Sequence, residues 1–556
     1  MPAAENPVSI ASIQPGDPLS AWLEEDLRAA AAALPLPLDA LAEHPEIPPE
    51  RFRACAARGI PFVPGETLPC DEGALALLSP VKARELRAVP LLVTGAAALV
   101  AFEDPTDDES VAVLGFLLSR RIVPVLATPS AIERALAAYD RREDEAILKK
   151  LGLAVRGEGE SGASPASMER LATEKPVVAL VQEILQKAIA RRASDIHLRP
   201  TAEGAELLYR IDGELLRVRT FLTGLVPAVV SRFKVIAGMD LAEHRRPQDG
   251  RATVSAPDGR AIDLRLSLLP TVHGESLAIR ILDRAAGVRR LDEIGFSAEE
   301  VGRLQGLLAR GHGLLLVTGP TGCGKTTTLY AMLLALIERR IEILTIEDPV
   351  EYRIAGIEQM QVNRAVGFSF ASALRNVLRH DPDAIMVGEI RDRETAAIAV
   401  ESALTGHLVL STLHANTAAS AVTRLLDLGV EPFMLRATLL AAIAQRLVRL
   451  NCPRCLAPEP IPSWMREGFG LSPEEAFLRA RGCRACEGLG RAGRTAVYEL
   501  LEVTSLLRGL IQAGADADRL LAAARAAGMR TLGEHALALA RAGRIPLAEA
   551  WRVSYD

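Results

Sequence analysis

Residues 313–326 have the sequence GLLLVTGPTGCGKT, in which an apolar run leads into a glycine-rich loop. The apolar run, residues 313–318, predicts a buried strand, and residues 327–339 after the loop have the composition of a helix. The loop, residues 319–326, fits the pattern G-x-x-x-x-G-K-[S/T], whose backbone N–H groups surround a phosphate at the N-terminus of the following helix. This segment predicts a nucleoside triphosphate site between a strand and a helix.

The side chains of the loop supply the rest of the phosphate chemistry. Lys325 provides a point cation for the β- and γ-phosphates, and Thr326 can ligate Mg²⁺. Only seven of the 64 Lys and Arg residues are lysines, so a lysine here stands out from an arginine-rich background. A glycine-rich turn before a core helix is the structural alternative, but it does not explain the complete match. The residues expected to bind the nucleotide are Gly319, Pro320, Thr321, Gly322, Cys323, Gly324, Lys325, Thr326 and Thr327.

Three further apolar runs end in polar side chains that phosphoryl transfer can use. These runs, residues 342–346, 383–387 and 407–412, are followed by Glu347, Glu389 and His414 respectively. The alternation of short strands and helices predicts a mostly parallel, doubly wound sheet, so the strand ends should meet in one cleft. A carboxylate there can orient the attacking water or hold the water shell of the metal, and an imidazole can sense the γ-phosphate.

The overall composition excludes several classes of protein. The chain has 556 residues, a formal net charge of −6, 49% hydrophobic and 24% charged residues, which is typical of globular proteins and not of disordered or polybasic ones. The longest nearly uninterrupted apolar run, residues 89–102, is shorter than the roughly 18 residues that a membrane helix needs. The first residues lack the pattern of a secretory signal, so a cytosolic location is expected.

Changes in composition along the chain predict four parts. Residues 1–140 mix short apolar runs with helical patterns and predict a small α/β domain. Residues 141–174 carry a charged run and then a Gly-, Ser- and Pro-rich run, which predicts a flexible linker. Residues 175–285 predict an α+β middle domain, and residues 286–556 predict the nucleotide-binding domain.

Four of the seven cysteines form two C-x-x-C pairs. Cys452 and Cys455 make the first pair, Cys483 and Cys486 make the second, and each spacing lets two thiolates meet one ion. These residues predict a tetrahedral Zn²⁺ site in a module at about residues 450–490. The metal is expected to be structural because four thiolates leave no open position. Two disulfides are the alternative, which a reducing cytosol disfavours.

Several segments together resemble one enzyme family. The loop and the segments ILTIEDPVEY (343–352), LRHDPDAIMVGEIRD (378–392) and TGHLVLSTLHAN (405–416) are similar to the Walker A, Asp box, Walker B and His box of the secretion ATPase superfamily that drives type II secretion and type IV pili. The similarity extends to residues 190–200, 209–215, 245–251, 264–283 and 444–449. The departures from the family pattern are Cys323 for Ser or Ala, His380 for Gln and Ala415 for Thr. The Walker B run is itself unusual, because Gly388, followed by Glu389, stands where an Asp is expected at its carboxyl end.

The resemblance implies an α/β fold with a RecA-like P-loop ATPase domain, a PAS-like α+β middle domain, a small N-terminal α/β domain and a zinc-binding insertion. It also implies a homohexamer that uses ATP, Mg²⁺ and Zn²⁺. In such a hexamer Arg265 and Arg280 reach the nucleotide and stabilise charge in the transition state, while Glu389 or Glu347 orients water. Arg375 and Arg379 lie at helical i, i+4 spacing before the Walker B strand.

The implied function is cytoplasmic ATP hydrolysis that powers pseudopilus assembly and protein export by a type II secretion system. Residues 77–140 resemble the domain that docks on the cytoplasmic segment of an inner-membrane platform protein, and residues 421–455 are closer to the secretion branch than to the pilus branch. Pilus extension is the first alternative, and a nucleotide-sensing docking protein without turnover is another. The net charge and the 4% aromatic content disfavour a RecA-like nucleic-acid motor, so no nucleic-acid partner is expected.

Overall fold

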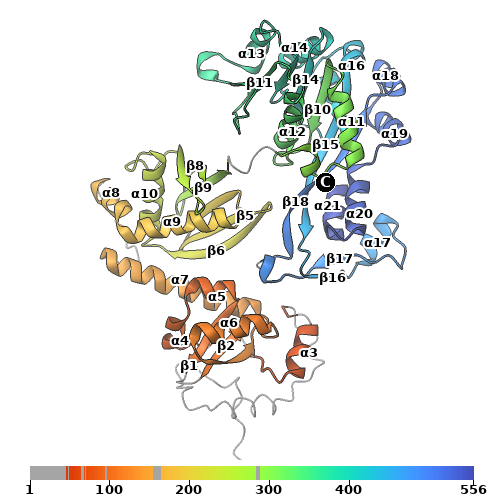
Figure 1. Cartoon of the computed structure of the whole chain (residues 1–556). Helices are drawn as coiled ribbons and strands as arrows, with labels where there is room; N and C mark the ends of the chain where they lie inside the picture. Colours follow the sequence, from red (N-terminus) through yellow and green to blue (C-terminus); the bar gives the residue numbers. More distant parts are fainter. Residues whose placement is uncertain are drawn as a thin grey trace, which may run out of the picture. The chain divides into compact units, whose positions relative to one another are not determined.

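The computed structural model describes residues 46–47, 49–63, 68, 70–93, 97–153, 165–283, 289–486 and 488–555. The chain forms two compact units, which meet in sequence between Asp283 and Arg284 (Figure 1). None of the described helices is long and apolar enough to cross a membrane.

The first unit begins with a small α/β module. Its sheet has the order β1 (Ala88–Val93), β2 (Ala97–Phe102), β3 (Arg121–Leu126), with β2 antiparallel to β1 and parallel to β3. The helices are α3 (Pro49–Ala57), α4 (Glu72–Leu77), α5 (Pro80–Glu85), α6 (Asp108–Leu118) and α7 (Pro129–Leu151). Apolar residues of all three strands pack with α7 in one core. This module agrees with the predicted small N-terminal α/β domain.

Helix α7 runs beyond the N-terminal module and takes in residues 141–151, which the sequence assigned to a flexible linker. Its residues Asp140, Asp144 and Leu148 are spaced four apart, so they share one face, and all three are buried. The charged run therefore forms a packed helix, because its acidic side chains face Arg219 of the next module. Helix α8 (Pro165–Thr173) covers the other end of the predicted linker, and residues 154–164 lie outside the described part of the chain.

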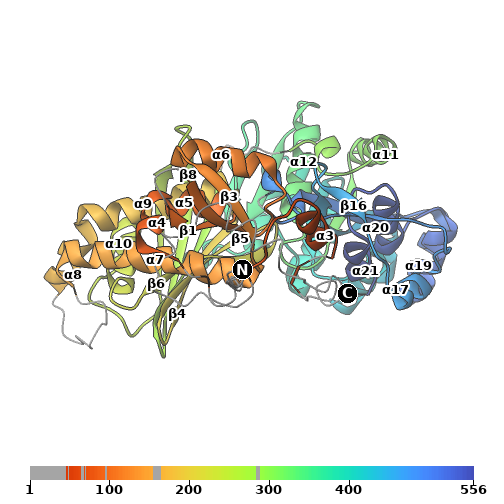
Figure 2. The same ribbon diagram turned by 90° about the horizontal axis from the view of Figure 1, so that it is seen from below.

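A six-stranded antiparallel sheet forms the middle of the chain. Its strands are β4 (Asp195–Thr201), β5 (Gly204–Ile211), β6 (Glu214–Leu222), β7 (Gln248–Ser255), β8 (Ala261–Thr271) and β9 (Gly274–Asp283), in the order β6-β5-β4-β9-β8-β7. Helices α8, α9 (Lys175–Ala190) and α10 (Val226–Ala237) lie close together in both views (Figures 1 and 2). The apolar faces of α9 and α10 share one core with the sheet. This is the expected α+β module.

The second unit is built on a seven-stranded sheet with the order β12-β11-β13-β14-β10-β15-β18. The strands are β10 (Gly313–Thr318), β11 (Ile343–Glu347), β12 (Glu358–Gln361), β13 (Ala384–Val387), β14 (Leu408–Leu413), β15 (Leu439–Asn451) and β18 (Arg491–Glu502). All neighbours are parallel except β15 and β18. Strands β10, β11, β13 and β14 are buried along their whole length, as expected when helices cover both faces.

Helices pack against both faces of this sheet and enclose two cores. They are α11 (Ala298–Leu308), α12 (Lys325–Ile337), α13 (Phe370–Val377), α14 (Arg393–Leu404), α15 (Ala418–Asp427), α16 (Pro432–Thr438), α18 (Ser505–Gln512), α19 (Ala517–Ala526), α20 (Leu532–Arg541) and α21 (Leu547–Tyr555). Between β15 and β18 the chain forms a small module with β16 (Leu456–Pro458), α17 (Ser463–Phe469) and β17 (Leu478–Ala480). The domain is RecA-like, as predicted, with the cysteine module inserted before its last strand.

Candidate functional site

The phosphate loop lies between β10 and α12. Strand β10 ends at Thr318, and α12 begins at Lys325. A Cβ on Gly319 would lie 2.5 Å from the backbone carbonyl oxygen of Gln445, and a Cβ on Gly324 would lie 2.8 Å from the side-chain nitrogen Nε2 of Gln445. Both glycines also have positive φ. The loop therefore requires glycine at these two positions because its backbone passes directly over strand β15.

Lys325 is folded back onto the loop. Its Nζ donates to the carbonyl oxygens of Gly319 at 2.8 Å and Pro320 at 3.1 Å. Burial lowers the pKa of Lys325, and the nearby negative charge of Glu389 acts in the opposite direction. The following residues of the helix, Thr326 and Thr327, have exposed side chains. The ammonium group thus lies over the loop with two carbonyl contacts that phosphate oxygens can replace.

Glu389 and His414 lie together at the ends of neighbouring strands. Glu389 follows β13, His414 follows β14, and their nearest side-chain atoms, Oε2 and Nε2, are 3.7 Å apart. The other carboxylate oxygen of Glu389 pairs with Arg391 at 2.6 Å. Only 13% of the Glu389 side chain is exposed, whereas half of His414 is exposed. Two of the residues predicted to meet the loop are thus adjacent, and Glu389 is close enough to influence Lys325 electrostatically.

Glu347 has a different environment, although it ends the neighbouring strand β11. Its carboxylate is buried and accepts hydrogen bonds from Tyr330 Oη, from Thr345 Oγ1 at 2.8 Å and from Gln359 Nε2 at 3.0 Å. Both carboxylate oxygens are therefore engaged inside the domain. The sequence pattern placed Glu347 at the correct strand end, but two of these partners, Tyr330 of α12 and Gln359 of β12, lie outside its own strand, and no motif pointed to them.

Gly388 stands where an aspartate is expected at the end of β13. A Cβ at this position would lie 3.1 Å from the carbonyl oxygen of Ile346 and 3.5 Å from the Cα of Glu347. Strands β11 and β13 approach closely here, since the Gly388 N–H donates to the same Ile346 oxygen at 2.8 Å. The close approach explains the missing side chain, and it leaves Glu389 as the acidic residue that follows β13.

An open hollow of about 330 Å³ borders His414 on the side of α15. Its lining is mostly polar and consists of His414, Ala415, Asn416, Ser420, Thr423, Arg424 and Asp427. The hollow is continuous with the loop that follows β14, so His414 lies between Glu389 and an accessible polar surface.

Arg265 and Arg280 belong to the first unit, where they are directly opposite each other on β8 and β9. Arg251 on β7 is opposite Arg265, so three arginines lie side by side across three strands. Arg280 pairs with Asp195 at 3.3 Å. Like charges on directly opposite residues are unfavourable, and a bound anion would relieve their repulsion. Arg251 was not among the predicted site residues, because only the strand register brings it beside the other two.

Arg375 and Arg379 follow the expected helical spacing near the end of α13. Arg375 forms an ion pair with Glu394, and Arg379 donates to Asn376 and to the carbonyl oxygen of Arg375. Both side chains are exposed and occupied by local partners.

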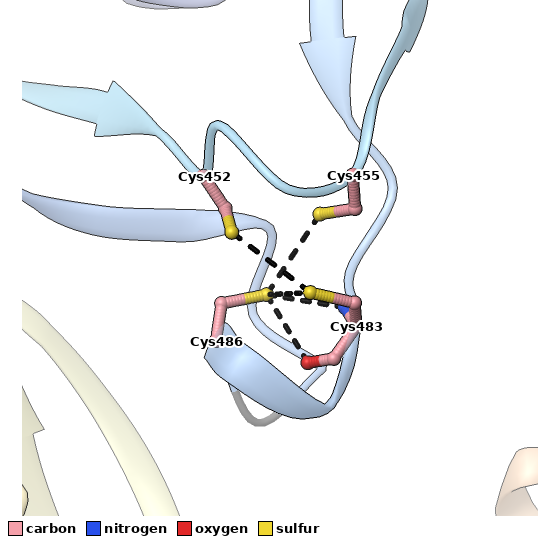
Figure 3. A group of neighbouring side chains, drawn as sticks. All are labelled: Cys452, Cys455, Cys483 and Cys486. Atoms are coloured by element: carbon pink, nitrogen blue, oxygen red, sulfur yellow. Dashed lines mark hydrogen bonds between the residues drawn. The ribbon is translucent and has the colours of Figure 1, made fainter. Parts of the chain in front are cut away.

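The four paired cysteines converge at one point (Figure 3). The Sγ atoms of Cys452 and Cys483, and those of Cys455 and Cys486, are each 3.9 Å apart, and those of Cys483 and Cys486 are 3.8 Å apart. Four thiolates at about 2.3 Å from one Zn²⁺ are separated by about 3.8 Å along a tetrahedral edge. Disulfide sulfurs are about 2.05 Å apart, so the cluster does not have disulfide geometry. The donor set and its spacing fit zinc.

The remaining cysteines are isolated. Burial raises the pKa of Cys55 and that of Cys70 to about 11, and it also raises the pKa of Cys323 in the phosphate loop. Burial therefore disfavours the reactive thiolate form of all three cysteines.

Comparison with known proteins gives the family. The model described as type II/IV secretion system protein matches residues 170–552. The chain belongs to this family. A second model, the MshEN domain, matches residues 58–146. The secretion ATPase chain is 46% identical over 381 residues to the type II secretion system protein HxcR of Pseudomonas aeruginosa, covering 68% of this chain and 78% of that protein.

This secretion ATPase is also similar, over a longer stretch, to a pilus protein. It is 39% identical over 525 residues to the type IV pilus assembly ATPase PilB of Thermus thermophilus, covering 92% of this chain and 58% of that protein. The solved structure of the ATPase DotB of Legionella pneumophila has the same fold, with a TM-score of 0.52 and 21% identity over 68% of this chain and 95% of that one. As a member of this family with a complete phosphate loop, the protein is an ATP-binding ATPase.

Proposed function

We propose that this secretion ATPase hydrolyses Mg²⁺-bound ATP at the ends of β10, β13 and β14. The observation that carries the proposal is that Lys325, Glu389 and His414 lie around one phosphate loop. The backbone N–H groups of residues 319–327 hold the phosphates, except at Pro320, which has no N–H; Lys325 contacts the β- and γ-phosphates, and Thr326 ligates Mg²⁺. The magnesium ion neutralises charge that develops on the phosphate oxygens.

Glu389 is the residue that orients the attacking water. Its carboxylate is partly accessible and lies beside His414, whereas the carboxylate of Glu347 already accepts hydrogen bonds from Tyr330, Thr345 and Gln359. A group that positions water needs a free acceptor facing the nucleotide. Glu347 therefore supports the site by holding Tyr330 and Gln359, and His414 reports the γ-phosphate to the polar hollow beside α15.

The protein works as a homohexamer in which Arg265 and Arg280 approach the nucleotide. The alignment of Arg251, Arg265 and Arg280 across adjacent strands supports this role, because it creates a concentrated positive surface suited to a triphosphate. Cations that arrive only when domains close stabilise the transition state and couple hydrolysis to movement.

Type II secretion is the process that this ATPase drives, through assembly of a pseudopilus. Relatives named as type II secretion proteins at 43–47% identity support this over the alternative, pilus extension, for which the relative in Thermus thermophilus is 39% identical. The protein acts in the cytoplasm and reaches the inner membrane through a platform protein that binds its N-terminal domain. The four-cysteine cluster holds a structural Zn²⁺.

A hydrolysis assay tests the proposal. The purified full-length protein is expected to release phosphate from ATP only with Mg²⁺, and Lys325→Ala is expected to abolish release and nucleotide binding. Lys234→Ala is unsuitable as a control because Lys234 is buried in an ion pair with Glu275. Lys149→Ala, at an exposed position of α7, is the matched control and should retain the wild-type rate. Equal rates in wild type and Lys325→Ala would refute the proposal.

A further inference from the structure

Strand β15 forms the floor of the phosphate loop. It is parallel to β10, and the last pair in register is Thr318 with Ala444. Beyond this pair β10 turns into the loop, while β15 continues to Asn451. The next residue of β15, Gln445, is 2% exposed and lies directly under the loop.

The side-chain amide of Gln445 bridges the loop and the helix that follows it. Its Nε2 donates to the carbonyl oxygen of Cys323 at 2.9 Å, and its Oε1 accepts from Thr328 Oγ1 at 2.7 Å. The orientation of the amide follows from its partners, because a backbone carbonyl can only accept a hydrogen bond. Thr328 is buried as well, so neither contact is replaced by water.

The contact with Cys323 determines where the next backbone N–H points. In a planar trans peptide the C=O and the following N–H point in opposite directions. A Cys323 carbonyl held down on β15 therefore turns the N–H of Gly324 away from β15. Gly324 precedes the first residue of α12, where an N–H of the loop meets phosphate.

We propose that Gln445 is a positioning residue of the ATP site, which fixes the Cys323–Gly324 peptide so that the Gly324 N–H faces the nucleotide phosphates. This inference rests on the proposed function. Gln445 does not touch the nucleotide; it acts through the loop backbone.

The neighbouring residue extends the same support to the loop that carries His414. Arg446 is largely buried, lies near Gly319, and places its NH2 group 3.4 Å from the backbone and side-chain oxygens of Asn416. On the other side, Thr318 Oγ1 donates to the Ala415 carbonyl at 2.8 Å. Strand β15 thus contacts both loops of the site: Gln445 contacts the phosphate loop, and Arg446 contacts the loop that carries His414.

A pair of substitutions separates positioning from general stability. Gln445→Met keeps the side-chain length but removes both hydrogen bonds, including the one to the loop. Thr328→Val removes only the bond between Gln445 and α12 and leaves the loop contact in place. The probe is Mg²⁺-ADP, whose dissociation constant is measured on the full-length protein together with KM for ATP and the thermal midpoint.

Gln445→Met is expected to weaken ADP binding and raise KM by roughly tenfold, the effect of leaving a buried carbonyl unpaired and its loop misaligned. Thr328→Val should change both constants by no more than about threefold. The thermal midpoint of Thr328→Val should fall about as far as that of Gln445→Met, because each variant loses the buried bond between Gln445 and Thr328. Binding by Gln445→Met within twofold of wild type would overturn the inference. Equal losses of affinity in the two variants would also overturn it, because they would indicate a structural effect alone.

Gln445→Glu provides a second test that does not depend on the methionine variant folding. A protonated carboxyl group has a donor and an acceptor like the amide, whereas an ionised one repels the Cys323 carbonyl. ADP affinity of this variant should rise as pH falls from 8 to 6, relative to wild type and to Thr328→Val. A pH profile parallel to wild type would contradict the inference.

Lys325→Ala separates this inference from the proposed function. Wild-type ADP affinity in Lys325→Ala would refute the proposed nucleotide site as a whole. Loss of affinity in Lys325→Ala together with retained affinity in Gln445→Met would refute only the role of Gln445.

Discussion

Glu347 ends β11 and Glu389 follows β13, and although both were predicted from motifs at strand ends, their surroundings differ. Glu347 is buried among three donors, and its neighbour Tyr330 has a raised pKa because it is buried beside this carboxylate. Glu389 faces Arg391 and His414 and retains partial exposure. A carboxylate that is already saturated with hydrogen bonds stabilises the fold, whereas one with an accessible oxygen can act on water.

Substitution of each glutamate by glutamine is expected to separate these roles. Glu389→Gln should lower kcat by about 10²- to 10⁴-fold with little change in KM, because it removes a catalytic base or water-orienting group. Glu347→Gln should lower the free energy of unfolding by about 1–3 kcal/mol, because a donor replaces an acceptor among buried partners, and should lower kcat less than Glu389→Gln does. Phosphate release and thermal unfolding measure the two effects. A larger loss of kcat in Glu347→Gln would reverse the assignment.

Secondary-structure elements differ in how far the sequence alone determines them. Residues 313–318 form β10 as predicted, since a short apolar run before a glycine-rich loop is a local signal. The pairing of Arg251 with Arg265 depends on the register of β7 and β8. The position of Gln445 under the phosphate loop depends on a contact between residues 122 apart in the sequence. No local pattern encodes them. Strand ends could therefore be predicted, but not the surroundings of each side chain.

In helix α7 a local sequence signal gave a wrong prediction. Its charged run has the composition of a solvated linker, yet Arg219 of β6 pairs with Asp144 at 2.6 Å and with Glu143 at 3.0 Å. The Leu222 N–H also donates to Asp144 at 2.7 Å. Tertiary contacts with a single buried arginine thus convert the run into an element that joins the N-terminal and middle modules within the first unit.

This contact should respond to pH. Burial raises the pKa of Asp144 to about 6, although Arg219 opposes the shift. The folded state then binds a proton more tightly than the unfolded state, so this group's contribution to stability is present below about pH 4 and is lost as pH rises through about 6. Asp144→Asn carries no charge and should not show this loss. Hydrogen exchange of α7 and β6 in the full chain, corrected for intrinsic rates, should therefore slow in the variant relative to wild type as pH rises from 5 to 7.

Glu145→Gln is the control for this experiment, because Glu145 is the exposed neighbour of Asp144 on the same helix. It should follow the wild-type profile. A constant difference between Asp144→Asn and wild type across this pH range would contradict the assigned titration.

The cysteine module is an element whose stability we expect to depend on metal. Its described residues form short strands, one short α-helix and one short 3₁₀ helix between β15 and β18. The cysteines and Ala480 pack in a small cluster of their own, whereas Met465, Leu471 and Phe477 join the main core. Full-length protein is expected to contain about one zinc per chain, and Cys452→Ser with Cys455→Ser should lose the metal and increase protease sensitivity near residues 450–490. Cys70→Ser, outside the module, should retain zinc. Wild-type protein that resists protease equally well with and without zinc would contradict this expectation.

At the scale of the whole molecule, the two units carry complementary parts of the proposed machinery. The phosphate loop, Glu389 and His414 belong to the second unit, and the three aligned arginines belong to the first. In a ring of identical chains, an arginine can serve either the loop of its own chain or that of a neighbour. These arrangements predict different behaviour for mixtures of inactive variants.

Mixing Lys325→Ala with the double variant Arg265→Gln, Arg280→Gln distinguishes the two arrangements. Each variant alone should hydrolyse ATP at least tenfold more slowly than wild type, because one lacks the loop cation and the other lacks the approaching arginines. If the arginines serve a neighbour, an equal mixture that exchanges subunits has both intact parts at about a quarter of its sites, and phosphate release should recover toward that fraction. If they serve their own chain, no site of the mixture is intact and the rate stays at the level of the separate variants.

We expect recovery, since a cation supplied by the neighbouring chain makes each hydrolysis step depend on the position of that neighbour. Mixing either variant with Arg217→Gln, which alters an exposed arginine on β6, measures how much activity subunit exchange alone returns.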